Sequence, residues 1–171
     1  MQPVIVDLDV IRDISPDAAA DQWNPRPGSL EAIARLSRAD RRVLVTGTAV
    51  RSTDTTVTLD RLTRLHNRMC QAASNAGGEI DAVCFCPHPP QAQCPCRPPR
   101  PGLLLDIGLR LQLRLDTVPY LTLAGGDGRL AGQAAGARCL VLGSATDTDA
   151  PCFDTLDAAV QFLLDENNAN H

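Results

Sequence analysis

Short apolar runs that alternate with amphipathic segments are the feature that most constrains the fold of this chain. Five runs have the length of a buried strand, and they lie at 3–6, 42–45, 82–85, 120–123 and 138–142. The segments between them are long enough for helices that cross from one strand to the next. Strands that alternate with helices in this way are typical of βαβ units and a parallel sheet. We therefore expect an α/β fold, a Rossmann-like parallel sheet of about five strands with helices on both faces.

Apolar residues recur at helical spacing in the segments between the expected strands. Ser29 is expected to cap one helix, with Glu31 in its first turn, and Thr58 is expected to start a longer one. Further helices are expected over 102–113, between the last two strands, and over 156–164. Residues 12–28 hold three prolines and a glycine, so a loop is expected there. A chain of 171 residues suits one domain, which we expect to span 1–171.

Composition excludes several classes of partner. The net charge of −4 gives no general attraction for nucleic acid. No apolar stretch approaches the roughly 20 residues that span a bilayer, and the N-terminus does not resemble a signal peptide, so a cytoplasmic protein without a membrane partner is expected. All 16 basic residues are arginine, because the chain contains no lysine. Any catalytic step that needs a cation must therefore use arginine or a metal ion.

The proline-rich segment 86–101 carries four residues that can bind one metal ion: Cys86, His88, Cys94 and Cys96. Three thiolates and one imidazole are a common tetrahedral zinc set, and the paired C-x-H and C-x-C spacing lets each short arm supply two ligands. Four protein ligands leave no open position, so a structural zinc is favoured over a catalytic one. Cys84 belongs to the preceding strand and is left out of the set. The alternative is a flexible loop with incidental cysteines.

Acidic and small residues follow three of the expected strands, at 7–9, 46–48 and 125–127. In open parallel sheets the ligand lies beyond the carboxyl ends of the strands, so these segments are expected to meet at one site. Two carboxylates directly after a buried strand, Asp7 and Asp9, are typical of phosphatases with an aspartate nucleophile. Taken alone, the pair is also compatible with a solvated loop.

Several of these segments together resemble the haloacid dehalogenase superfamily, and within it the D,D-heptose 1,7-bisphosphate phosphatases and the related histidinol-phosphate phosphatases. The matching segments are 4–9, 23–36, 43–46, 65–66, 80–83, 86–88, 94–97 and 99–102. They cover roughly the whole chain in order, and the zinc loop is their most specific part. The Pro-x-Pro-Gly ending of that loop, at 99–102, favours the heptose enzymes.

The resemblance implies a phosphatase that hydrolyses a small sugar phosphate, similar to D-glycero-D-manno-heptose 1,7-bisphosphate, through an aspartyl-phosphate. It assigns the nucleophile to Asp7 and the general acid and base to Asp9. It assigns phosphate binding to Thr46, Arg97 and Arg100, and magnesium binding to Asp7, Asp9 and Asp127. No large cap domain is expected, so the zinc loop and residues 47–57 would shape the pocket.

The chain departs from the family pattern at positions that hold phosphate or metal. The first motif has Val10 and Ile11 where the family has glycine and a small residue, and Gly47 and Thr48 replace its amide side chains. Pro98 stands at the position of the family's lysine.

In the fourth motif, the family's two acids fall at about Ala124 and Gly128, and Asp127 could replace one only if the loop has shifted. Two functions therefore remain open: a working phosphatase, or a pseudophosphatase that keeps the fold and the zinc site to bind a ligand or a protein. A zinc-ribbon nucleic-acid module is a third alternative, disfavoured because aromatic residues are only 3% of the chain. A monomer or a weak homo-oligomer is expected.

Overall fold

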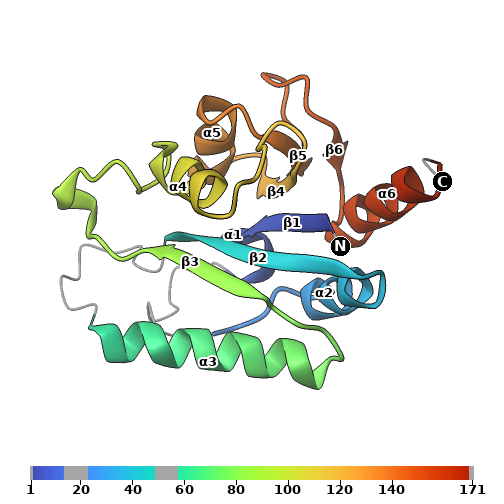
Figure 1. The fold of residues 1–171 in the computed structure, drawn as a ribbon, viewed down its shortest axis with the longest axis horizontal. Coiled ribbons are helices and arrows are strands. Elements are labelled where there is room, and N and C mark those ends of the chain that lie inside the picture. Colours follow the sequence, from blue (N-terminus) through green and yellow to red (C-terminus); the bar gives the residue numbers. More distant parts are fainter. Residues whose placement is uncertain (1, 14–22, 49–57, 170–171) are drawn as a thin grey trace.

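The computed structural model describes residues 2–13, 23–48 and 58–169, and it contains one parallel sheet in the order β3-β2-β1-β4-β5-β6 (Figure 1). The strands are β1 (Gln2–Asp7), β2 (Arg41–Thr48), β3 (Ala82–Cys86), β4 (Pro119–Leu123), β5 (Arg138–Leu142) and β6 (Cys152–Phe153). All neighbouring strands pair in parallel. The expected parallel sheet is confirmed. The sixth strand was not predicted, because two residues are too short to show a strand period.

Helices cover both faces of the sheet. They are α1 (Leu8–Ile11), α2 (Ser29–Arg38), α3 (Leu59–Asn75), α4 (Gly102–Arg110), α5 (Asp127–Ala134) and α6 (Leu156–Ala169), with a short 3-10 turn, η1 (Pro90–Ala92). Figure 1 shows α4 and α5 on one side of the sheet and α2 and α3 on the other. In the described part of the chain, no helix is both long and apolar enough to cross a lipid bilayer.

The core has two halves because alternate strand residues point to opposite faces of the sheet. Val4 and Val6 pack with residues of α2, α3 and α6, whereas Ile5 packs with Leu104 of α4 and with α5. Burial on both faces explains why the strands appear in the sequence as continuous apolar runs. The central strand β1 thus ends inside the molecule, and the residues that follow it begin at the carboxyl edge of the sheet.

Several element ends differ from the sequence expectations. Asp7 and residues 46–48 were expected beyond their strands, but Asp7 ends β1 and residues 46–48 belong to β2, because Thr46 to Thr48 pair with β3. Ser29 does not cap α2: Gly28 takes that position at φ 78°, and the Ser29 hydroxyl donates to the Ile11 carbonyl at 3.1 Å. The helix expected over 102–113 ends at Arg110, and the last helix continues to Ala169. Thr58, which was expected to start α3, is its N-cap, and the helix begins at the next residue, Leu59.

Candidate active site and metal centre

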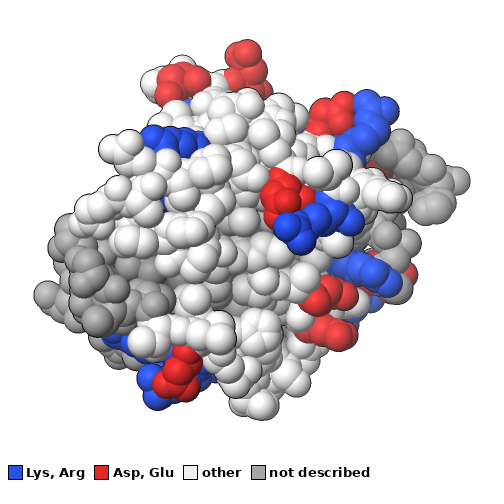
Figure 2. All heavy atoms as spheres, turned by 60° about the vertical axis from the view of Figure 1, so that its left-hand side comes forward, with Lys and Arg blue, Asp and Glu red and all other residues white. Residues whose placement is uncertain are grey.

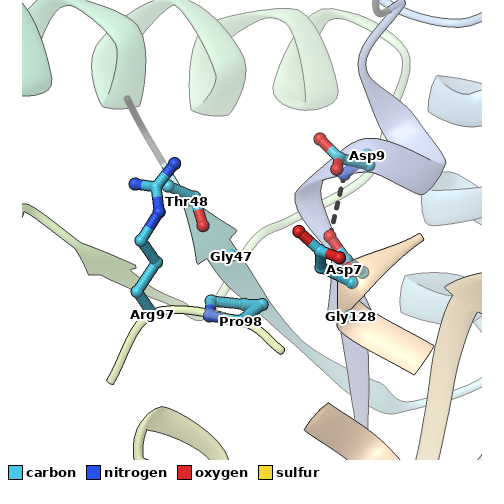
Figure 3. Close-up of a pocket in the computed structure, with 8 residues that line it drawn as sticks. Asp7, Asp9, Gly47, Thr48, Arg97, Pro98 and Gly128 are labelled. Carbon is cyan, nitrogen blue, oxygen red and sulfur yellow. Dashed lines mark hydrogen bonds between the residues drawn. The ribbon is translucent and has the colours of Figure 1, made fainter. Parts of the chain in front are cut away.

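A pocket of about 190 Å³ opens at the carboxyl edge of the sheet. Its walls come from the ends of β1 and β2, the start of α5 and the end of the cysteine-rich loop (Figure 3). The lining residues are Asp7, Asp9, Gly47, Thr48, Arg97, Pro98, Asp127 and Gly128. The three segments that the sequence analysis placed at this edge each contribute to it. Residues 49–57, which were also expected to shape the pocket, lie outside the described residues.

Asp7 forms the floor of this pocket and is 5% exposed. Its Oδ1 accepts a hydrogen bond from the Asp9 backbone N–H at 3.0 Å, because Asp7 is also the N-cap of α1. Its Oδ2 accepts a hydrogen bond from the Tyr120 hydroxyl at 3.1 Å. Each carboxylate oxygen therefore accepts at least one hydrogen bond from a fixed donor.

Asp9 lies two residues after Asp7, in α1, and it also lines the pocket (Figure 3). Its carboxylate is 3.6 Å from the guanidinium of Arg12, which is buried. Its backbone carbonyl accepts a hydrogen bond from Arg26 at 3.2 Å. These contacts fix the position of Asp9 in the same pocket as Asp7.

The end of β2 supplies Gly47 and Thr48 to the pocket, while the preceding Thr46 is buried. Asp7 and Thr46 are register partners on adjacent strands, so the expected proximity of the two residues is confirmed. Thr46 itself does not line the pocket, and its buried hydroxyl has no hydrogen-bond partner among the described residues. Gly47 has φ 149°, and a Cβ there would stand 3.1 Å from the Leu8 Cβ, which explains a glycine beside Asp7.

Of the two arginines that the family resemblance assigned to phosphate, Arg97 lines the pocket and Arg100 does not. Arg97 lines it together with Pro98, and Figure 3 shows the Arg97 side chain beside Thr48, across the pocket from the aspartates. Arg97 also donates to the His88 carbonyl at 3.1 Å. Arg100 instead donates to the carbonyls of Gln93 and Cys94. Arg97 is therefore the better placed of the two for an anion.

The start of α5 completes the wall with Asp127 and Gly128. Asp127 is the exposed first residue of the helix, whereas Gly128 is buried against Asp7. Tyr120, the contact of Asp7 on β4, was missed by the sequence analysis. The signal available was that the chain's one tyrosine stands in a mainly apolar, buried strand. Burial, with the neighbouring Asp7 carboxylate, raises the pKa of Tyr120 well above its usual value, so the hydroxyl stays protonated and donates.

Asp7, Asp9 and Asp127 present the oxygen donors that suit magnesium, and they line one pocket. Magnesium commonly takes one or two protein carboxylates and completes its shell with water and phosphate oxygens, so this donor set fits it. The three carboxylates are not drawn into a tight cluster, however. Among the described residues, the Cys/His group is the one set of potential ligands that is gathered closely enough to share an ion.

That Cys/His group consists of Cys86, His88, Cys94 and Cys96, whose ligand atoms all lie within 4.8 Å of one another. The three Sγ atoms are 3.4–3.5 Å apart, and His88 Nδ1 is 3.2 Å and 3.8 Å from the nearest two of them. Tetrahedral zinc with bonds of 2.0–2.3 Å would place its ligands about 3.6–3.8 Å apart. The measured edges are close to that figure, so the predicted ligand set converges on one point.

Burial and the neighbouring thiols of Cys94 and Cys96 raise the pKa of Cys86 to about 12. A thiolate at this position is therefore unfavourable without a cation beside it. Because metal ligation requires thiolates, a bound metal ion would supply that stabilisation. On the face shown in Figure 2, acidic and basic side chains are interspersed among uncharged ones.

No known family profile matches this chain. Among curated proteins, the D-glycero-beta-D-manno-heptose-1,7-bisphosphate 7-phosphatase of Bordetella bronchiseptica is 37% identical, over 82% of this chain and 80% of that protein. The protein of the same name from Neisseria meningitidis serogroup B is 30% identical, over 99% of this chain and 98% of its own length.

Solved structures agree with this relationship. The D,D-heptose 1,7-bisphosphate phosphatase from B. bronchiseptica, complexed with magnesium and phosphate, matches with a TM-score of 0.82 at 30% identity, covering 97% of this chain and 99% of that one. The enzyme of that name from Burkholderia thailandensis matches with a TM-score of 0.71 at 26% identity, covering 96% and 99%. Sequence and fold thus lead to one conclusion: this chain belongs to the D-glycero-β-D-manno-heptose-1,7-bisphosphate 7-phosphatase family, within the haloacid dehalogenase superfamily.

Proposed function

We propose that this protein is a phosphatase that hydrolyses a small sugar phosphate of the heptose 1,7-bisphosphate type. The observation that carries this proposal is the carboxylate pair, Asp7 and Asp9, at the end of the central strand in a pocket that also holds Arg97. The names of the relatives support the substrate class.

Asp7 would act as the nucleophile. One of its oxygens attacks phosphorus and the ester P–O bond breaks, while Asp9, as the acid, gives its proton to the departing sugar oxygen. The hydrogen bonds from Asp9 N–H and Tyr120 fix the plane of the Asp7 carboxylate before attack. Such preorientation lowers the entropy that is lost on reaching the transition state.

Asp9 would then act as a base. It takes a proton from water, the water oxygen attacks phosphorus, and the bond between phosphorus and Asp7 breaks to release phosphate and the free carboxylate. The position of Asp9, two residues after Asp7 and in the same pocket, suits both proton transfers.

The phosphate brings negative charge towards carboxylates that repel it. Arg97 is the pocket-lining cation, and its side chain lies across the cavity from the aspartates. Magnesium held by Asp7, Asp9 and Asp127 would supply the remaining positive charge. The Cys/His group would hold a structural zinc that fixes the loop carrying Arg97.

The competing possibility is a protein that binds a sugar phosphate without turnover. Three positions favour it, because Pro98, Ala124 and Gly128 carry no charge where the family pattern has a lysine and two acids. We expect the wild-type protein to release inorganic phosphate from heptose 1,7-bisphosphate in the presence of magnesium. The Asp7→Asn substitution should abolish that release. Asp106→Asn, on the outer side of α4, is the matched control and should keep full activity. Equal, background release by the wild type and Asp7→Asn would select the binding protein instead.

A further inference from the structure

Gly128 lies so close to Asp7 that no other residue fits at this position without moving the carboxylate. A Cβ at 128 would stand 1.6 Å from Asp7 Oδ2 and 2.8 Å from the Tyr120 hydroxyl oxygen. The first separation is far inside van der Waals contact. The Asp7 carboxylate and the Tyr120 hydroxyl thus fill the space that a side chain at 128 would occupy.

A second glycine on the same face of α5 accommodates the Tyr120 ring. Gly132 follows Gly128 by one helical turn, and a Cβ at 132 would lie 2.8 Å and 2.9 Å from two ring carbons of Tyr120. Tyr120 is 2% exposed, and its neighbours in the sheet are Ile5 and Cys139. The ring has no room to turn away, so its hydroxyl stays directed at Asp7.

We propose that Tyr120 is a positioning residue for phosphoryl transfer, held between β4 and the two glycines of α5 so that its hydroxyl fixes the Asp7 carboxylate. The catalytic part of this inference rests on the proposed function. The buried Tyr120 hydroxyl donates to Asp7 Oδ2, and the Asp9 backbone N–H donates to Asp7 Oδ1. Together the two hydrogen bonds fix the orientation of both carboxylate oxygens, with no side chain at position 128.

The contact can be tested without turnover, because the chain contains one tyrosine. Protein labelled with ¹³Cζ-tyrosine should give a single ring-carbon resonance that reports the state of this hydroxyl. We expect Asp7→Asn and Gly128→Ala to shift it, because the first replaces the acceptor and the second displaces it. Gly125→Ala is the matched control: its Cβ would meet nothing within 4 Å, and the resonance should not move.

The kinetic test is Tyr120→Phe, which keeps the ring and removes the hydroxyl. Losing one hydrogen bond to a charged group should lower kcat about ten- to a hundredfold, with KM changed less than about threefold. A residue that only filled the core would lower thermal stability and leave kcat unchanged, and that result would overturn the proposal. A tyrosine resonance that shifts in neither Asp7→Asn nor Gly128→Ala would also overturn the proposal.

The resonance experiment and the kinetic experiment also distinguish this inference from the proposed function. An inactive wild type would end the proposed phosphatase activity and with it the catalytic role of Tyr120. The Tyr120–Asp7 contact would then be decided by the resonance alone.

Discussion

The Sγ atoms of Cys86 and Cys94 lie 3.5 Å apart, although one residue ends β3 and the other follows the short turn η1. The intervening segment is rich in proline and exposed, so apolar burial contributes little to its shape. A shared ligand at the Cys/His group gives a physical reason for this close approach. It also explains how the loop can present Arg97 to the pocket in a fixed position.

Removing one cysteine of the Cys/His group should therefore unfold the loop. We expect about one zinc per chain in the purified protein, and Cys94→Ala to lose the metal together with about 4 kcal/mol or more of stability, because structural metal sites contribute directly to folding. Cys152→Ala, at an exposed cysteine outside the group, should change neither. Elemental analysis and thermal denaturation check both points; a stable, metal-free wild type would contradict the zinc assignment.

Substitution of the two arginines of the loop should have different effects on the KM for the substrate. Arg97→Ala removes the pocket-lining guanidinium, and a charge-assisted contact is worth about 1.5–3 kcal/mol, so KM should rise about ten- to a hundredfold. Arg100→Ala removes hydrogen bonds to the Gln93 and Cys94 carbonyls, so it should cost about 1 kcal/mol of stability and leave KM near the wild-type value. Steady-state phosphate release measures both. The reverse pattern would assign the phosphate to Arg100.

Asp127 should affect the requirement for magnesium more than the maximal rate. Asp127→Asn keeps the shape of the first residue of α5 and removes one carboxylate from the pocket, so half-maximal activation should need about tenfold more magnesium. Asp106→Asn, on α4 away from the pocket, is the control for a general loss of negative charge. A magnesium titration that is the same for all three proteins would remove Asp127 from the metal site.

The central strand should carry much of the stability that holds the site. Ile5 is fully buried beside the α4 and α5 layer, and Ile5→Ala should cost about 2–5 kcal/mol because it leaves a cavity. Leu59→Ala, at a side chain that is 80% exposed, should change stability by less than about 0.5 kcal/mol. Chemical denaturation followed by circular dichroism compares the two. If both substitutions lowered the free energy of unfolding equally, Ile5 would not be part of the core.

The sequence by itself determined the elements and the chemical types of the site. Strand and helix periods are local properties, so the five longer strands and the helix that begins after Thr58 could be predicted from neighbouring residues. The Cys/His group could be predicted because all of its ligands lie within 11 residues of the chain, 86–96. Asp7 could be placed at the sheet edge because it directly follows a buried run.

Only the tertiary structure decided which residues face one another across the pocket. The order of the strands and the side from which each helix packs brought Asp127 and Gly128 to Asp7, and Arg97 rather than Arg100 to the cavity. Tyr120 became a contact of Asp7 because β4 lies next to β1, and because two glycines let α5 approach it. Such contacts depend on packing between segments more than a hundred residues apart, as with Asp7 and Tyr120. The local pattern of apolar and polar residues in the sequence therefore does not predict them.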